Sequence, residues 1–411
     1  MENKFTSKRS VAKVLANAMN LLDEKYPMHH EQTAYLAYRM AAELGYDEND
    51  RKEIIWDSLM YDVGLVILPD EKDYSFRELS VAGLNIVGDV KQIQFVRRMF
   101  LAGQADSEGD PAYEILSKEA RFAEIIHLSR KVSKLLKYSD AALNQVEDIC
   151  ESISSMAGNG LHSWVVECFL RVAKTEYIWM DLLHQPEVVL TYIPDGMDIS
   201  IDETIELARF MSRVIDFRSS YTAAHSVGVA VSAVRLAEIM GMSADECKMM
   251  AIAGYLHDIG KLKVPKDILE KGEKLTDEEF NIVKEYAYYT YLFLKDIPGF
   301  EQIGSWAALH HEKLNGYGYP FGLKMGEIPM GAQILGVADI FSAVAEVRAY
   351  RQSMAKEGVM KTLADSIEKG ALSGYIVELM LTNFDDIFSK RDEEVRKESA
   401  RYTASILDTE E

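Results

Sequence analysis

The segment HSVGVAVSAVRLAEIMGMSADECKMMAIAGYLHDIGK, residues 225–261, decides the fold of this chain. Its apolar side chains recur every three to four residues in two runs, which is the period of a helix that buries one face. Between the runs stands GMSADE, where Ser243 is placed to cap the second helix. We therefore expect two consecutive helices, the second of which ends in the polar pair His257 and Asp258.

The helical period extends well beyond this segment, to residues 205–217, 278–294 and 330–346. Proline is scarce, at 9 of 411 residues, which favours long helices over strands and turns. No series of alternating strands is evident. A chain of this length exceeds what one core usually serves, and the helical pattern is interrupted by IPDGMDISIDE at 193–203. We predict an all-α fold with two domains, residues 1–195 and 196–411.

The two halves of the chain are related by an internal repeat. A shift of 196 residues lays HHEQTAYLAYRMAAELGYDENDRKEIIWDSLMYDVGL, which starts at His29, on the segment that starts at His225 without a gap. Asp62 then meets Asp258. The first copy, however, has Tyr61 at the position that corresponds to His257 of the second copy. The chain therefore reads as a duplication in which only the second unit keeps its polar residues.

Four segments of the second half place histidine or aspartate in apolar helical surroundings. These residues are His225, His257, Asp258, His310, His311 and Asp339. A carboxylate in such a stretch is expected to be buried, and burying it unpaired costs on the order of several kcal/mol. Imidazole and carboxylate groups on converging helices are typical of a metal site. Lys261 follows Asp258 by three residues, so it is expected to face the same site and to clamp a phosphate there.

Composition and charge exclude several classes of function. Lys and Arg number 45 against 66 Asp and Glu, a net charge of −21, and no local basic patch is evident. This balance argues against binding a nucleic-acid polymer or an anionic membrane. The three widely spaced cysteines suit a reducing compartment. Because neither a secretory signal nor a membrane-spanning run is evident, we expect a cytoplasmic protein. The charge-dense tail from Lys390 is expected to be a solvated terminal helix or a frayed end.

Four motifs together resemble those of the HD-GYP family, a branch of the HD phosphohydrolase superfamily. The motifs are TAAHS at 222–226, HDIGK at 257–261, HHEKLNGYGYP at 310–320 and VADIFSAVAEVRAYR at 337–351. The first half of the chain resembles a degenerate HD domain. The resemblance implies two tandem all-helical HD-type domains, with two divalent metal ions, iron or manganese, in the second. It also implies phosphodiesterase activity on cyclic di-GMP or 3′,3′-cyclic GMP-AMP.

The resemblance also implies a role for each site residue. One metal would be held by His225, His257, Asp258 and Asp339, and the other by Asp258, His310 and His311. The catalytic residues would be Asp258 and Lys261, with Lys261 at the scissile phosphate. Substrate would be bound by Lys261, Arg348, Arg351 and the loop Gly316, Tyr317, Gly318, Tyr319 and Pro320. Two metals about 3.5–4 Å apart would activate water and polarise the phosphoryl group.

One departure from the family pattern affects the second metal. The family has a further histidine in a KxHxxxG segment, where this chain reads KEYAYYT, with Tyr286 at the histidine position and Thr290 at the glycine position. A phenol with a pKa near 10 is a poor ligand at neutral pH unless a metal lowers that pKa. We therefore expect a weakened second metal.

Three hypotheses of function remain open. The leading one is a phosphodiesterase whose first domain regulates or dimerises. The second is a catalytically weak receptor for a cyclic dinucleotide or a signalling protein. The third, a nucleotide phosphohydrolase of the wider HD superfamily, leaves the GYP loop unexplained. The expected partners are the cyclic dinucleotide, a diguanylate cyclase or other signalling protein, and a second copy of the chain.

Overall fold

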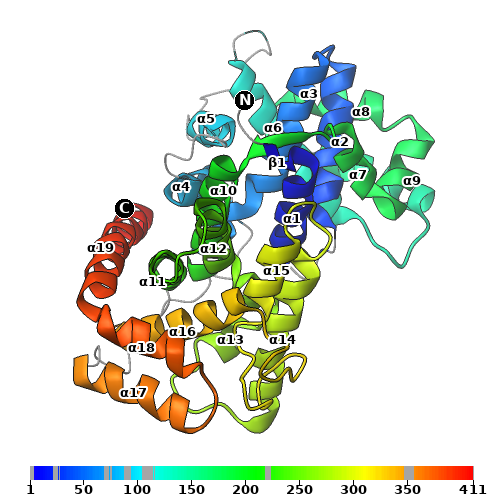
Figure 1. Ribbon diagram of the computed structural model, residues 1–411. Coiled ribbons are helices and arrows are strands. Elements are labelled where there is room, and N and C mark those ends of the chain that lie inside the picture. The colour runs from blue at the N-terminus through cyan, green and yellow to red at the C-terminus, as the bar shows by residue number, and fades with distance from the viewer. Residues whose placement is uncertain are drawn as a thin grey trace. The chain divides into compact units, whose positions relative to one another are not determined.

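The computed structural model describes residues 4–21, 26, 28–68, 74, 76–87, 94–103, 114, 116–217, 224–346 and 356–410. These residues are mainly helical, with one two-stranded sheet (Figure 1). The all-α prediction is therefore confirmed. Arg348 and Arg351, predicted to bind substrate phosphates, lie outside the described residues.

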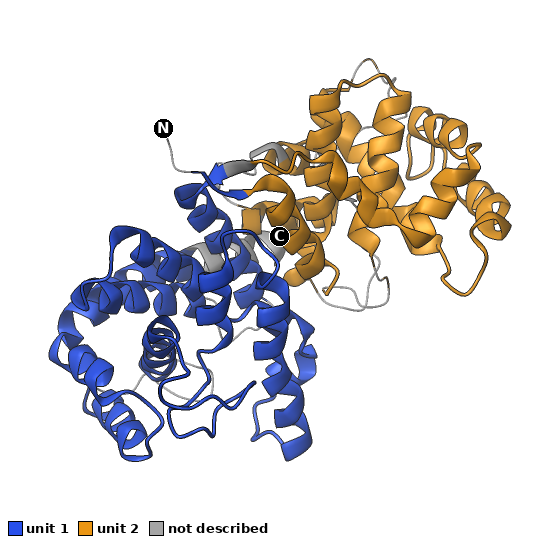
Figure 2. Cartoon of the chain, turned by 45° about the vertical axis from the view of Figure 1, so that its right-hand side comes forward, with its two compact units in different colours: residues 1–6, 197–407 blue, residues 7–196, 408–411 orange. Residues whose placement is uncertain are grey.

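The chain forms two compact units (Figure 2). Unit 1 comprises residues 1–6 and 197–407, and unit 2 comprises residues 7–196 and 408–411. The strands β1 (Lys4–Ser7) and β2 (Met197–Ser200) pair with each other, so the N-terminal strand joins unit 1 although the next helix belongs to unit 2. Part of the segment that interrupts the helical pattern thus forms a strand.

Unit 2 is built from short and medium helices. They are α1 (Lys8–Met19), α2 (His29–Glu43), α3 (Glu48–Met60), η1 (Tyr61–Val66), α4 (Phe76–Val87), α5 (Gln94–Gly103), α6 (Lys118–Leu135), η4 (Ala142–Gln145), α7 (Val146–Ser154), α8 (Ser163–Val172), α9 (Glu176–His184) and η5 (Pro186–Tyr192).

Unit 1 has longer helices at its centre. They are α10 (Ile201–Phe217), α11 (His225–Ile239), α12 (Ala244–Leu256), η6 (Ile259–Lys263), α13 (Lys266–Leu269), α14 (Asp277–Leu294), α15 (Glu301–Ala308), α16 (Met330–Ala345), α17 (Lys356–Glu368), α18 (Gly374–Thr382) and α19 (Phe384–Glu410). In the described part of the chain, no helix is long and apolar enough to cross a bilayer.

The internal repeat holds at the level of whole helices. The helices α2 and α11 have 15 residues each, α3 and α12 have 13 each, and both pairs begin and end 196 positions apart. After α2 and α11 the chain turns at Gly45 and Gly241, with φ of 79° and 76°, a left-handed conformation that favours glycine. Asp47 and Ser243 then cap α3 and α12 through their side chains. The same local chemistry therefore shapes both copies.

The terminal helix α19 differs from the expected solvated tail. Arg391 is only 2% exposed and Glu398 only 4% exposed. Glu398 accepts hydrogen bonds from Arg213 Nε at 2.5 Å and from Arg209 Nη2 at 3.0 Å, both on α10. The prediction of a wholly solvated or frayed end is therefore wrong, because one face of this charged helix meets buried partners.

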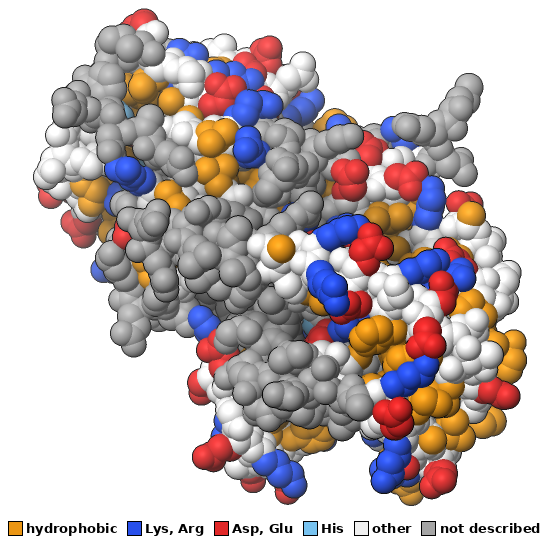
Figure 3. Space-filling model, turned by 90° about the vertical axis from the view of Figure 1, so that its left-hand side faces the viewer, with side chains coloured by type: hydrophobic (Ala, Val, Ile, Leu, Met, Phe, Trp, Pro, Cys, Tyr) orange, Lys and Arg blue, Asp and Glu red, His pale blue; other side chains and the backbone are white. Residues whose placement is uncertain are grey.

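The surface is consistent with the charge argument. On the face shown in Figure 3, the described Lys and Arg side chains alternate with Asp and Glu side chains and do not gather into a basic patch. Any attraction for an anionic ligand must therefore come from local charges within a site rather than from this surface.

Candidate metal centre

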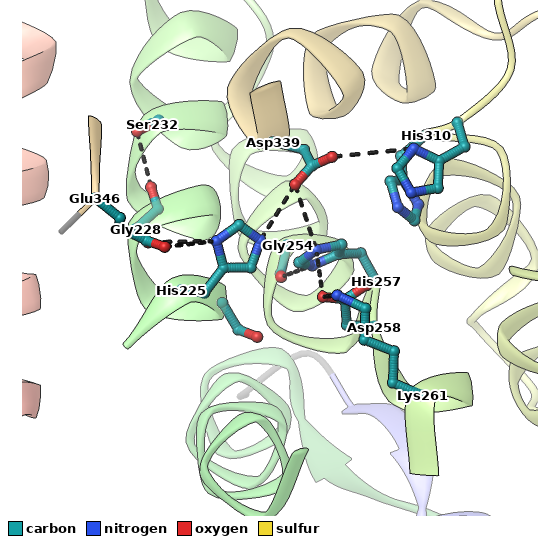
Figure 4. Close-up of polar contacts among 12 residues, drawn as sticks. His225, Gly228, Ser232, Gly254, His257, Asp258, Lys261, His310, Asp339 and Glu346 are labelled. Atoms are coloured by element: carbon teal, nitrogen blue, oxygen red, sulfur yellow. Dashed lines mark hydrogen bonds and ion pairs between the residues drawn. The ribbon is translucent and has the colours of Figure 1, made fainter. Parts of the chain in front are cut away.

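Six polar side chains predicted from the sequence meet within unit 1 (Figure 4). They come from the start of α11, the end of α12, the residues after α15 and the middle of α16. Their ligand atoms form two groups, and within each group all the atoms lie within 4.8 Å of one another. The first group is His225, His257 and Asp258, and the second is His310, His311 and Asp339. Asp339 Oδ1 also lies 3.1 Å from His225 Nε2 and 4.0 Å from His257 Nε2, so it faces both groups.

Two of the histidines are oriented by backbone carbonyls. His257 Nδ1 lies 2.8 Å from the carbonyl oxygen of Gly254, and His310 Nδ1 lies 2.6 Å from that of Ala307. A carbonyl only accepts hydrogen bonds, so each Nδ1 carries the proton. The Nε2 lone pair of each ring is then available to a metal, which is how histidine ligands are usually held.

Carboxylates flank both nitrogens of His225. Its Nε2 faces Asp339, and its Nδ1 lies 3.3 Å from both oxygens of Glu346 (Figure 4). Burial lowers the pKa of His225, but Glu346 and Asp339 outweigh burial and raise the pKa to about 10. Glu346 was not found from the sequence, because no local motif pairs it with a histidine 121 residues away.

Asp258 carries its charge in a buried position. It is 2% exposed, and its Oδ2 accepts a hydrogen bond from Lys261 Nζ at 2.5 Å. Burial by itself raises the pKa of Asp258, but His257 and Lys261 hold that pKa well below its usual range. Lys261 therefore faces the site, as predicted.

The first group has the properties that a divalent metal ion requires. Among the described residues, neither Asp258 Oδ1 nor His257 Nε2 has a hydrogen-bond partner, although both are buried. Such groups are costly unless something binds them. Ligands of a transition metal stand about 2.0–2.3 Å from it, so their atoms lie within about 4.6 Å of one another. The ligand atoms of this group all lie within 4.8 Å of one another, and the donor set suits a divalent metal.

The second group differs because Tyr286 already bonds two of its members. The Tyr286 hydroxyl lies 3.0 Å from His310 Nε2 and 2.5 Å from His311 Nε2. Since His310 Nε2 is an acceptor, the phenol donates to it and accepts from His311. Burial raises the pKa of Tyr286 well above its usual range, and nearby Asp258 acts in the same direction. A metal would bind this group only after the phenol gives up these bonds.

The HDIGK motif packs directly on α14. A Cβ atom added to Gly260 would lie 1.9 Å from the carbonyl oxygen of Tyr286, so only glycine fits there. Thr290 Oγ1 donates to the carbonyl of His257 at 3.0 Å and accepts from the amide of Gly260 at 3.1 Å. Thr290 thus holds the His257–Asp258 turn against α14, a role that its position in KEYAYYT did not suggest.

The loop that contains Gly316 to Pro320 is closed by a carboxylate. Glu312, directly after the histidine pair, accepts hydrogen bonds at 2.7, 3.1 and 2.9 Å from the backbone amides of Phe321, Gly322 and Leu323. A Cβ atom on Gly318 would lie 2.4 Å from Glu312 Cα, which explains the glycine. Glu312 is therefore a positioning residue that the sequence interpretation missed.

The predicted substrate residues of this loop differ in placement. The ring of Tyr319 lies 4.7 Å from that of His311 and so borders the metal centre. Tyr317 is 84% exposed. Gly316 has a φ of +81°, and Pro320 follows a cis peptide bond. Their contacts with substrate stay predictions.

The corresponding place in unit 2 holds an arginine. Asp62 Oδ1 accepts a hydrogen bond from Arg130 Nε at 2.6 Å, and its Oδ2 lies 3.2 Å from His29 Nε2. Nearby, Tyr61 OH lies 2.7 Å from His127 Nδ1. Burial raises the pKa of Asp62, but Arg130 and His29 reverse that shift and hold the pKa well below its usual range. A guanidinium thus neutralises the carboxylate that remains from the repeat.

Comparison with known proteins agrees with this architecture. The model of the HD domain family matches residues 209–369. The chain is 24% identical over 373 residues to 3′3′-cGAMP-specific phosphodiesterase 1 of Vibrio cholerae, with 86% of each chain covered. It is 35% identical over 155 residues to the cyclic di-GMP phosphodiesterase response regulator RpfG of Xanthomonas campestris, covering 37% of this chain and 41% of that relative.

A solved structure supports the fold alone. The crystal structure of a cyclic GMP-AMP specific phosphodiesterase of V. cholerae matches with a TM-score of 0.61 and 17% identity, covering 93% of this chain and 98% of the other. Together with the HDIGK and HHEKLNGYGYP motifs, these matches show that residues 209–369 form an HD domain and that the chain is similar to cyclic-dinucleotide phosphodiesterases.

Proposed function

We propose that this protein is a metal-dependent phosphodiesterase that hydrolyses a 3′,3′-cyclic dinucleotide, either cyclic di-GMP or 3′,3′-cyclic GMP-AMP. The observation that carries the proposal is the convergence of His225, His257 and Asp258 on one point, with unpartnered Asp258 Oδ1 and His257 Nε2 atoms in the described structure and Lys261 beside them. Relatives named for both activities match the chain.

The metal ligands would divide between two places. The first group would hold one divalent ion, iron or manganese, together with Asp339. The second ion would bind more weakly at His310 and His311, because the Tyr286 hydroxyl competes for them. When bound, such ions supply Lewis-acid polarisation of the phosphate and a more acidic water.

The protein's own residues would position and neutralise the substrate. Lys261 offers a partly buried ammonium whose pKa stays raised, since its pairing with Asp258 outweighs burial. That ammonium would bind a non-bridging phosphate oxygen and offset the charge that develops in the transition state. Tyr319 would shield His310 and His311 from bulk water. Local cations thus explain how a chain of charge −21 binds an anion.

A receptor is the second candidate function, and Tyr286 favours it. A phenol that satisfies both His310 and His311 leaves a site able to bind one ion and a dinucleotide without rapid hydrolysis. Occupancy would then be the signal. The two functions differ in turnover, not in binding.

The test is product formation by chromatography. Protein reconstituted anaerobically with Fe(II) or Mn(II) is incubated separately with cyclic di-GMP and 3′,3′-cyclic GMP-AMP. We expect linear dinucleotide or mononucleotide from one of them. Asp258→Asn, which keeps the shape but not the charge of the side chain, should abolish the product, whereas Asp386→Asn, at an exposed position of α19, should not.

Binding without turnover would overturn the phosphodiesterase and favour the receptor. If the protein neither binds nor hydrolyses a cyclic dinucleotide, both the phosphodiesterase and the receptor are overturned. The other predictions belong to the same proposal: unit 2 as a regulatory or dimerising unit, a diguanylate cyclase or other signalling partner, a homodimer, a cytoplasmic location, and phosphate contacts by Arg348 and Arg351.

A further inference from the structure

Glu346, at the end of α16, contacts the proposed metal ligand His225 at the ring nitrogen that faces away from the metal group. Glu346 caps the C-terminus of α16, and its two oxygens lie 3.3 Å from His225 Nδ1. The opposite ring nitrogen, Nε2, faces Asp339 and the metal group (Figure 4). A carboxylate only accepts hydrogen bonds, so this contact requires a proton on Nδ1. By the same argument Nε2 carries a proton toward Asp339 in the absence of a metal, so a metal bound at Nε2 would displace that proton while the Nδ1 proton stays on Glu346.

Glu346 is itself bound by a buried arginine from the terminal helix. Arg391 Nη2 donates to Glu346 Oε1 at 3.1 Å, and the Arg391 side chain is 2% exposed. To reach Glu346 it passes over Gly228 of α11, where an added Cβ would lie 3.1 Å from Arg391 Nε. Glycine at this position therefore leaves space for the arginine.

The docking of α19 does not depend on Arg391 alone. Arg235 of α11 binds Asp386 of α19 at 2.6 Å on the surface, and Arg213 of α10 binds Glu398 at 2.5 Å. A buried ion pair is on its own a weak source of stability, because desolvation offsets its attraction. The position of Arg391 is thus better explained by what it does to Glu346 than by holding the helix.

We infer that Glu346 and Arg391 form a positioning pair that holds His225 in its metal-binding tautomer and so couples helix α19 to the metal centre. The inference rests on the proposed function for the identity of the site. Arg391 sets the position of Glu346, and Glu346 sets the proton and the ring orientation of His225. Acidic partners of metal-bound histidines raise ligand basicity, and losing one typically costs about 10–100-fold in metal affinity.

Mn(II) alone is the probe, and free Mn(II) measured by electron paramagnetic resonance is the readout. Glu346→Gln keeps the size of the side chain but removes its charge, and should weaken Mn(II) binding about tenfold or more. Arg391→Met should weaken it in the same direction. The double variant should be no weaker than Glu346→Gln, because the two residues act through one contact.

Two further variants separate positioning from folding. Gly228→Ala keeps both charges but crowds Arg391, and should also weaken Mn(II) binding. Arg235→Ala removes a different bond between α11 and α19 and should leave binding within about twofold of wild type. In Glu346→Gln and Arg391→Met, turnover should fall mainly in kcat, with KM little changed. Circular dichroism confirms that each variant is folded.

The outcomes are distinct from those for the proposed function. Glu346→Gln that binds Mn(II) like wild type would overturn the positioning pair, and so would Arg391→Met that behaves like Arg235→Ala. Wild type that binds Mn(II), loses affinity in Glu346→Gln and hydrolyses no dinucleotide would overturn the proposed phosphodiesterase while supporting the pair.

Discussion

Tyr286 is the residue that competes with the proposed second metal ion for its ligands. Its hydroxyl bonds both His310 and His311, and it is buried beside the carboxylate of Asp258. A phenol in that position satisfies the imidazoles without a metal. The family pattern has histidine there, and a neutral imidazole is a better metal ligand at neutral pH than a phenol with a pKa near 10.

The first prediction concerns this residue. Tyr286→His should raise metal content above that of wild type, toward two ions per chain, and strengthen the second site by at least about tenfold, because it adds a ligand. Turnover should rise with it. Metal content is measured by inductively coupled plasma mass spectrometry and turnover by chromatography. Tyr286→Phe, which removes the hydroxyl without adding a ligand, is the matched control.

Unchanged metal content and rate in Tyr286→His would show that Tyr286 is not what limits the second metal. A gain in Tyr286→Phe equal to that in Tyr286→His would show that the hydroxyl blocks the site and that the missing imidazole is unimportant.

The second prediction concerns two buried histidines of unit 2. Burial lowers the pKa of both His30 and His127 to about 3. Their pKa in the unfolded chain is near 6.5, so unfolding takes up protons between these values. The stability of unit 2 should therefore be full above pH 6.5 and fall toward pH 3. Each histidine contributes up to about 1.4 kcal/mol per pH unit.

Urea unfolding at several pH values measures this slope. His127→Gln removes one titrating group but keeps an acceptor for the Tyr61 hydroxyl, so its stability should fall less steeply with acid. An identical slope in wild type and His127→Gln would contradict the assignment.

At the scale of elements, the loop after α15 depends on one carboxylate. Glu312 receives three backbone amides and so fixes the segment that carries Tyr319 against His311. Hydrogen bonds to a charged group contribute about 1.5–3 kcal/mol each. The loop is therefore held by contacts made at its own beginning.

The third prediction follows from that closure. Glu312→Gln should open the loop, speed amide exchange over residues 313–323 and raise KM for the dinucleotide, while metal content stays unchanged. Hydrogen exchange with mass spectrometry measures the first effect. Glu327→Gln is the control, because Glu327 accepts a single amide bond, from Lys324, at the exposed end of the same loop. Equal exchange in both variants would contradict this role of Glu312.

At the scale of the whole molecule, the two copies of the repeat surround their corresponding aspartates with different partners. Asp62 in unit 2 is paired with Arg130, whereas Asp258 in unit 1 has an unpartnered oxygen in the described structure. An internal guanidinium makes a metal unnecessary in unit 2. The duplication thus keeps the fold in both copies, with a metal site proposed in only one.

The fourth prediction tests this division. A chelator should speed amide exchange in residues 225–345 and leave residues 29–135 unchanged. Arg130→Met should speed amide exchange in residues 29–135 and leave residues 225–345 unchanged. It should lower the unfolding free energy of unit 2 by about 3–5 kcal/mol, because it leaves Asp62 buried without its partner. Hydrogen exchange resolved by peptide measures both. Loss of protection in unit 2 on chelation would show that a metal binds there as well.

Much of this protein follows from local sequence. The helical period, the turns at Gly45 and Gly241 and the caps Asp47 and Ser243 depend on neighbours a few residues away, so the all-α fold and the 196-residue repeat are visible without coordinates. The set of six candidate ligands is also visible, because polar residues in apolar helices need an explanation.

Only the tertiary structure decided the rest. The contact of Glu346 with His225 spans 121 residues, and that of Arg130 with Asp62 spans 68. The sequence of the terminal helix predicts a solvated tail, and only the structure shows that Arg391 is buried against Gly228. Local sequence determines which residues form helices and which could bind a metal. Which charge faces which depends on packing between distant helices, and no local period encodes that pairing.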